Sequence, residues 1–138
     1  MANALSSRAA VAPVRILNVD ADQAIRLSKS ACLKAEGFDV LEASTGIEAL
    51  ALAEQFDPEV VLLDINLPDL DAYEVCDRLR TCHARPGIIL QIVALRASSE
   101  DWRKSLEAGA DSYLIEPSKP WVLLRTINTV LSRRMLHA

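Results

Sequence analysis

Glu59-Val-Val-Leu-Leu-Asp64-Ile-Asn-Leu-Pro68 contains an uninterrupted apolar run, Val60 to Leu63, that is followed directly by the carboxylate of Asp64. The run leaves no polar face, and its β-branched residues favour an extended backbone, so it predicts a strand buried on both sides. Asp64 then lies at the carboxyl end of that strand, the edge of an open parallel sheet where ligands gather. Pro68 and the acids after it predict a turn.

The same alternation extends outward in both directions from this stretch. Apolar runs predict four further strands, and each strand is followed by a segment with helical spacing or cap signals. Because every connection is too long for a hairpin, we expect a doubly wound α/β fold with a five-stranded parallel sheet. The strands are expected over 14–19, 38–42, 60–64, 88–93 and 112–115, and the helices over about 22–36, 45–55, 71–83, 98–109 and 118–133.

Cap residues set the predicted helix ends. Thr45-Gly-Ile-Glu48 has the spacing of a capping box, and Ser118 is expected to cap the last helix. In the first helix, Ile25, Ser28, Ala31, Cys32 and Ala35 recur at helical spacing, which predicts the packed face, with Arg26, Lys29 and Lys34 on other faces.

Composition limits the classes of function. The chain has 138 residues, a net charge of -4 and 51% hydrophobic residues, which suits one globular domain. No basic cluster suggests direct nucleic-acid binding, and no apolar run is long enough to span a membrane, so a cytoplasmic protein is expected. Residues 1–13 are expected to form a flexible leader, 14–134 the folded domain and 135–138 a tail. The odd, unpaired spacing of the three cysteines favours buried thiols over a metal site.

Acidic residues are expected to meet at one crevice. In a doubly wound sheet the first and third strands end side by side, which brings Asp20 and Asp22 near Asp64. Gathered carboxylates favour a hard cation such as Mg²⁺, and the alternative is that Asp20 and Asp22 only cap a helix. A carboxylate beside bound Mg²⁺ can also accept a phosphoryl group, and spacing alone does not choose between these roles.

Several motifs together resemble one family. Arg15-Ile-Leu-Asn-Val-Asp20, Gly37-Phe-Asp-Val-Leu-Glu-Ala43, Gly46-Ile-Glu-Ala-Leu50, Val61-Leu-Leu-Asp64-Ile-Asn-Leu-Pro68 and Ala108-Gly-Ala-Asp-Ser-Tyr-Leu114 resemble the receiver domain of two-component response regulators. The resemblance implies a flavodoxin-like, three-layer α/β/α fold with sheet order 2-1-3-4-5.

The same resemblance implies site residues and partners. Asp64 is then the phosphoacceptor, Mg²⁺ is held by Asp20, Asp64 and Asn66, and Tyr113 is the aromatic switch position. A histidine kinase or a phosphotransfer protein is the implied phosphodonor. The fourth helix, fifth strand and last helix form the implied partner face, with a homodimer as one option.

Three departures from the family pattern affect the implied site. Ala21 stands where the family has a second, metal-binding acid; Val93 is assigned to the hydroxyl switch position; and Glu116 replaces the Lys after the fifth strand. A carboxylate in place of that Lys repels a phosphoryl dianion. Two compensations stay open: Glu116 turned outward to solvent, and Asp22 bound to a metal through water.

The sequence thus predicts a divergent receiver that acts largely through protein–protein contacts, with impaired phosphorylation of Asp64 and a weakened Mg²⁺ site. It is not expected to be an enzyme. The alternatives are an adaptor without phosphoryl chemistry and a haloacid-dehalogenase-like phosphatase, in which Asp20 would be the nucleophile and Asp22 the general acid/base. The short chain and the absence of a cap region disfavour the phosphatase.

Overall fold

The computed structural model describes residues 12–93 and 98–136 and has a five-stranded parallel sheet. The strand order is β2-β1-β3-β4-β5, which confirms the predicted fold class and its 2-1-3-4-5 order. The leader expected over 1–13 falls almost wholly outside the described residues. The elements, in chain order, are β1 (Arg15–Val19), α2 (Gln23–Ala35), β2 (Asp39–Ala43), α3 (Gly46–Phe56), β3 (Val60–Asp64), α4 (Ala72–Arg80), β4 (Gly87–Val93), α5 (Ser99–Glu107), β5 (Ser112–Glu116) and α6 (Pro120–Leu136).

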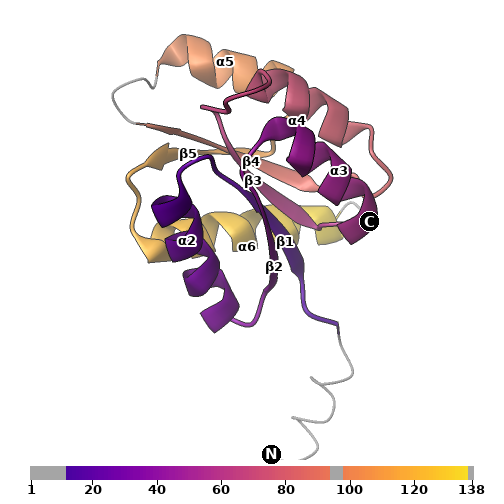
Figure 1. Cartoon of the computed structure of the whole chain (residues 1–138), viewed down its shortest axis with the longest axis vertical. Coiled ribbons are helices and arrows are strands. Elements are labelled where there is room, and N and C mark those ends of the chain that lie inside the picture. The colour runs from indigo at the N-terminus through magenta and orange to yellow at the C-terminus, as the bar shows by residue number, and fades with distance from the viewer. Residues whose placement is uncertain (1–11, 94–97, 137–138) are drawn as a thin grey trace, which may run out of the picture.

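Helices cover both faces of the sheet, so the molecule has three layers (Figure 1). On one face, α3 and α4 pack small and branched side chains against the strands. Ala108, the C-cap residue of α5, packs against the same cluster. On the other face α2 and α6 pack through a second cluster that contains Leu33 and Ile127. Strand β3 contributes to both clusters, and its first four side chains are fully buried, as the apolar run predicts.

Two sets of side chains accept hydrogen bonds from the backbone amides at the N-terminus of α3. Thr45 Oγ1 accepts a hydrogen bond from Glu48 N at 3.1 Å, and Glu48 Oε1 accepts from Ser44 N at 3.0 Å, so the predicted capping box forms with Ser44 as its second partner. The Asp69 carboxylate accepts from Gly46 N and Ile47 N, both at 2.8 Å. The hydrogen bonds from these amides hold the pKa of the Asp69 carboxyl below its usual range. This contact attaches the loop after β3 to α3.

The Thr45 cap gives a direct prediction of stability. A Thr45→Ala variant is expected to lower the free energy of unfolding by about 1 kcal/mol, because the Glu48 amide loses its acceptor at the helix start. Urea denaturation followed by circular dichroism measures the loss. Thr45→Ser keeps an acceptor and serves as the control, and an equal loss in both variants would contradict the cap assignment.

The packed face of α2 differs from the predicted face. Ile25 is 46% exposed, whereas Ser30 and Leu33 are the buried residues of the helix. The reason is a polar anchor from the sheet: the buried Asn18 Nδ2 donates to Ser30 Oγ at 3.0 Å and to Arg26 O at 3.0 Å. A prediction from apolar residues alone misses this face of α2, because one of its buried residues is Ser30, which is hydrogen-bonded to Asn18.

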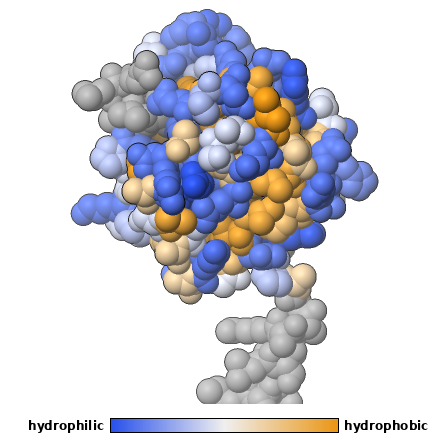
Figure 2. Space-filling view, viewed as in Figure 1, coloured by the Kyte–Doolittle hydropathy of each residue, from blue (hydrophilic) through white to orange (hydrophobic). Residues whose placement is uncertain are grey.

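Hydrophilic residues cover most of the face seen in Figure 2, and hydrophobic residues form a band to the right of and below its centre. In the described part of the chain, no helix has the length and apolar character needed to cross a membrane.

Helix α6 extends to Leu136, beyond the predicted end near Arg133.

Candidate functional site

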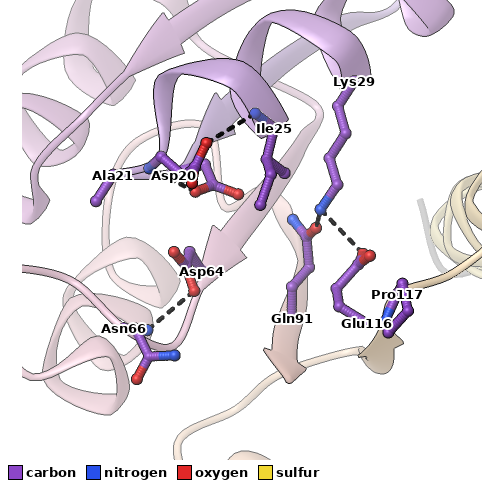
Figure 3. A pocket seen from close by; sticks show the side chains of 10 residues that line it. Asp20, Ala21, Ile25, Lys29, Asp64, Asn66, Gln91, Glu116 and Pro117 are labelled. Atoms are coloured by element: carbon purple, nitrogen blue, oxygen red, sulfur yellow. Dashed lines mark hydrogen bonds and ion pairs between the residues drawn. The ribbon is translucent and has the colours of Figure 1, made fainter. Parts of the chain in front are cut away.

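A cavity of about 490 Å³ opens where the strands end (Figure 3). Asp64 reaches it from the end of β3, Gln91 from β4 and Glu116 from the end of β5. The loop after β1 and the first turns of α2 close the other side. Its lining residues are Asp20, Ala21, Asp22, Ile25, Lys29, Asp64, Asn66, Gln91, Glu116 and Pro117. The structure therefore brings Asp20, Asp22 and Asp64 to one crevice, as expected from the strand order.

Asp20 and Asp22 have different surroundings. Asp20 is 5% exposed, and its Oδ1 accepts a hydrogen bond from Asp22 N at 2.9 Å. Asp22 is exposed and is the N-cap of α2, since its Oδ1 accepts from Ile25 N at 3.0 Å. The capping role weighed for the two acids thus applies to Asp22. Asp20 is the acid that lies beside Asp64.

Asp64 is a half-buried carboxyl with a raised pKa. Burial raises its pKa to about 6, and the negative charge of Asp20 acts in the same direction. The hydrogen bond from Asn66 N, at 3.0 Å from Oδ1, and the positive charge of Lys29 act in the opposite direction. A half-buried carboxyl beside a second acid forms a site that favours a proton or a cation.

Lys29 is the basic residue that lines the cavity, and it contacts both Glu116 and Gln91. Its Nζ lies 2.9 Å from Glu116 Oε1 and also donates to Gln91 Oε1. The two charged side chains are only 11% and 20% exposed. Glu116 thus turns into the crevice, and the alternative that it turns outward to solvent is wrong.

Ser118 also belongs to this cluster. Its N and Oγ both donate to the Glu116 carboxylate, at 3.1 and 3.3 Å. The expectation that Ser118 caps the last helix is therefore not met: α6 begins at Pro120, and the hydroxyl fixes Glu116 instead. Glu116 is held from two sides, by Lys29 and by Ser118.

Gln91 is a site residue that the sequence reasoning missed. It pairs with Asp64 in the β3–β4 register and is 2% exposed. It is the single polar residue within Gly87–Val93, a signal that was present in the sequence. Val93 lies two residues later and pairs in register with Glu116, and its side chain is outside the described residues. The assignment of Val93 to the hydroxyl position stays a prediction.

Tyr113 lies away from the cavity lining. It packs against the core on the α3 and α4 face, where the Trp102 ring meets it edge-on with centroids 5.4 Å apart. Burial raises the pKa of the Tyr113 hydroxyl. Its role as a switch position also stays a prediction.

The cavity suits a hard cation with few protein ligands. The carboxylates of Asp20 and Asp64 supply oxygen ligands and lose mutual repulsion when a cation binds. Asp22 already has one carboxylate oxygen engaged in capping α2. In the described residues no group of three or more His, Cys, Asp or Glu side chains forms a metal cage. Mg²⁺, which keeps several waters and needs only one or two carboxylates, fits this donor set.

Comparison with known proteins gives a consistent assignment. Residues 16–128 match the model of the response regulator receiver domain. Among curated proteins, the chain is similar to the cell cycle response regulator CtrA of Brucella ovis, at 34% identity over 91% of this chain and 53% of that protein. It therefore spans about half the length of these relatives.

Solved structures agree with that result. A CheY-like response regulator receiver domain protein from Methanospirillum hungatei has a TM-score of 0.85 and 35% identity, with 92% of this chain and 100% of that chain covered. The chemotaxis protein CheY4 of Vibrio cholerae has a TM-score of 0.81 and 29% identity, with 86% and 99% covered.

Proposed function

We propose, because this chain belongs to the family of response regulator receiver domains, that it works in phosphorelay signalling as a receiver with impaired phosphoryl acceptance at Asp64. The observation that carries the proposal is the Glu116 carboxylate inside the crevice, at the end of the strand where the family pattern has a Lys. A signal would then pass largely through protein contacts, in the cytoplasm. We expect no catalytic turnover of a substrate.

The proposed chemistry is one group transfer. An oxygen of the Asp64 carboxylate attacks the phosphorus of a phosphohistidine, and the P–N bond breaks with its electron pair leaving on the imidazole nitrogen. The product is an acyl phosphate on Asp64. Glu116 and Asp20 oppose it by repulsion, since the new group adds negative charge to a crevice that already contains both carboxylates.

Mg²⁺, when bound, would supply positive charge that offsets this repulsion. Asp20 and Asp64 are the carboxylates that would hold it, with Asn66 as the third ligand expected from the family. Ala21 offers no carboxylate at the edge of the same cavity, which supports weakened binding. A bridging water on the second oxygen of Asp22 remains part of this proposal.

The proposed partners are a histidine kinase or a phosphotransfer protein. The face formed by α5, β5 and α6 is the candidate surface for a homodimer. Its exposed apolar side chains support that choice, because aromatic residues are enriched at interfaces. Trp102 is 48% exposed, Ile115 48% and Trp121 58%, and the Arg125 guanidinium lies over the Trp121 ring.

Labelling with acetyl phosphate and Mg²⁺ tests the proposal. We expect a phosphate adduct by intact mass spectrometry that forms at least about tenfold more slowly than in an Ala21→Asp/Glu116→Lys variant, which is a barrier difference of about 1.4 kcal/mol. Asp64→Asn is the control and should show no adduct. Fast and complete labelling of the unmodified chain would contradict impaired acceptance.

The adaptor without phosphoryl chemistry makes a different prediction in the same samples. If the chain is such an adaptor, no variant forms a phosphate adduct, and the NMR signals of the backbone amides near Asp64 do not shift when Mg²⁺ is added. The phosphatase alternative has lost its basis, because the chain belongs to the receiver family and Asp22 caps α2.

A further inference from the structure

The buried amide of Gln91 has an unused donor. Its Nε2 has no hydrogen-bond partner among the described residues, although Gln91 is only 2% exposed. The orientation of the amide is fixed by chemistry: the Lys29 ammonium only donates, so the oxygen of Gln91 must face it. Nε2 is then directed away from Lys29 within the cavity (Figure 3). A buried donor without an acceptor is costly, which makes it a ready site for an incoming oxyanion.

Lys29 places a cation in the same cavity from a different element than the family pattern expects. Its side chain comes from α2, whereas the residue at the end of β5 is the acidic Glu116. Lys29 lies close enough to Asp64 that its charge lowers the carboxyl pKa. The crevice therefore keeps a lysine, which comes from α2 and not from the end of β5.

The Glu116 carboxylate competes for this lysine. It lies 2.9 Å from Lys29 Nζ and is itself held by Ser118. An oxyanion on Asp64 would therefore have to compete with the Glu116 carboxylate for the Lys29 ammonium. The arrangement explains how a lysine can be present while phosphoryl acceptance is still impaired.

We propose that Lys29 Nζ and Gln91 Nε2 form the oxyanion-binding pair of the Asp64 crevice, and that Glu116 limits binding by holding Lys29. The ligand class is a tetrahedral oxyanion or its fluoride mimic, bonded to the Asp64 carboxylate. The inference rests on the proposed function, because it needs Asp64 as the acceptor. It adds two residues that the family motifs do not contain.

Beryllofluoride, a tetrahedral mimic of a phosphoryl group on a carboxylate, is the probe. The full chain is titrated with it in the presence of Mg²⁺, and binding is followed by ¹⁹F NMR. Because each variant removes a hydrogen bond to a charged ligand, Lys29→Met and Gln91→Leu are each expected to weaken binding about tenfold or more. Glu116→Gln is expected to strengthen it by a similar factor, and Lys29→Arg should retain most of it.

Matched controls separate this effect from general charge and folding effects. Lys34→Met removes the same charge from the exposed end of α2 and is expected to leave binding unchanged. Glu116→Gln preserves shape and tests the proposal even if Lys29→Met fails to fold. Amide spectra verify that each variant is folded.

The outcomes distinguish the two proposals. Binding that is equal in the unmodified chain, Lys29→Met and Glu116→Gln overturns the oxyanion pair while keeping Asp64 as an acceptor. Weaker binding in Glu116→Gln overturns the competition by Glu116. An absence of binding in every variant overturns the proposed function, and the pair with it.

Discussion

A Lys29→Met variant is expected to lose about 2–3 kcal/mol of unfolding free energy, because it leaves the Glu116 carboxylate without its ion-pair partner in a largely buried position. Gln91 Oε1 loses its donor in the same step. The expected loss lies at or below the lower end of the range for fully buried pairs, since both side chains keep some solvent contact. Chemical denaturation of the chain at pH 7 measures it.

The matched experiment is a double-mutant cycle. Glu116→Leu and the combined Lys29→Met/Glu116→Leu variant complete it, and the combined variant is expected to recover most of the lost stability. The recovery follows because the double variant contains neither charge of the ion pair, so neither is left without its partner. If the two single losses simply add, the pair behaves like a surface ion pair of little net worth, and the expected effect is contradicted.

An Asp64→Asn variant is expected to be more stable than the unmodified chain at pH 7 and equally stable well below pH 3.8. Burial raises the pKa of Asp64 from 3.8 to about 6 in the folded state, so the folded chain holds this proton more tightly than the unfolded chain does. The contribution of the Asp64 carboxyl to the free energy of unfolding is therefore fully present below pH 3.8 and is lost as the pH rises through about 6. The asparagine has no charge to lose.

The expected difference at pH 7 is about 1–2 kcal/mol, which is less than the full pKa shift would give, since Asp64 is partly solvated. Urea unfolding of both proteins at several pH values, with a chelator present to exclude Mg²⁺, checks the result. Glu36→Gln, at an exposed position after α2, controls for general charge effects. A stability difference that does not change with pH would contradict the assignment.

Local sequence signals predict the fold well for physical reasons. The apolar run before Asp64 is fully buried along β3, and Thr45 of the predicted capping box accepts a hydrogen bond from the Glu48 amide. These features depend on neighbours within a few residues, so the sequence contains them directly. The convergence of Asp20 with Asp64 needs only the strand order in addition.

The chemistry of the crevice depends on contacts that no local pattern contains. Lys29 has the spacing of an outward-facing residue, yet it contacts Glu116, which lies 87 residues later in the chain. Asp69 has the sequence context of an ordinary turn acid. Its carboxylate nevertheless accepts hydrogen bonds from Gly46 N and Ile47 N at the start of α3, which lie 23 and 22 residues earlier in the chain. In both cases the partner is brought near by the sheet, so pairwise spacing in the sequence gives no signal.

The Lys29–Glu116 contact also has a consequence for the order of folding. Asp20, Lys29 and Asp64 belong to the part of the chain that forms β2-β1-β3, whereas Glu116 arrives only when β5 joins the other edge of the sheet. Because a contact of such long sequence separation needs the loop-closure entropy to be overcome first, we expect it to form late in folding. A contact absent from the transition state acts on the unfolding rate. We therefore expect the ion pair to slow the unfolding of the assembled sheet and to leave the folding rate nearly unchanged.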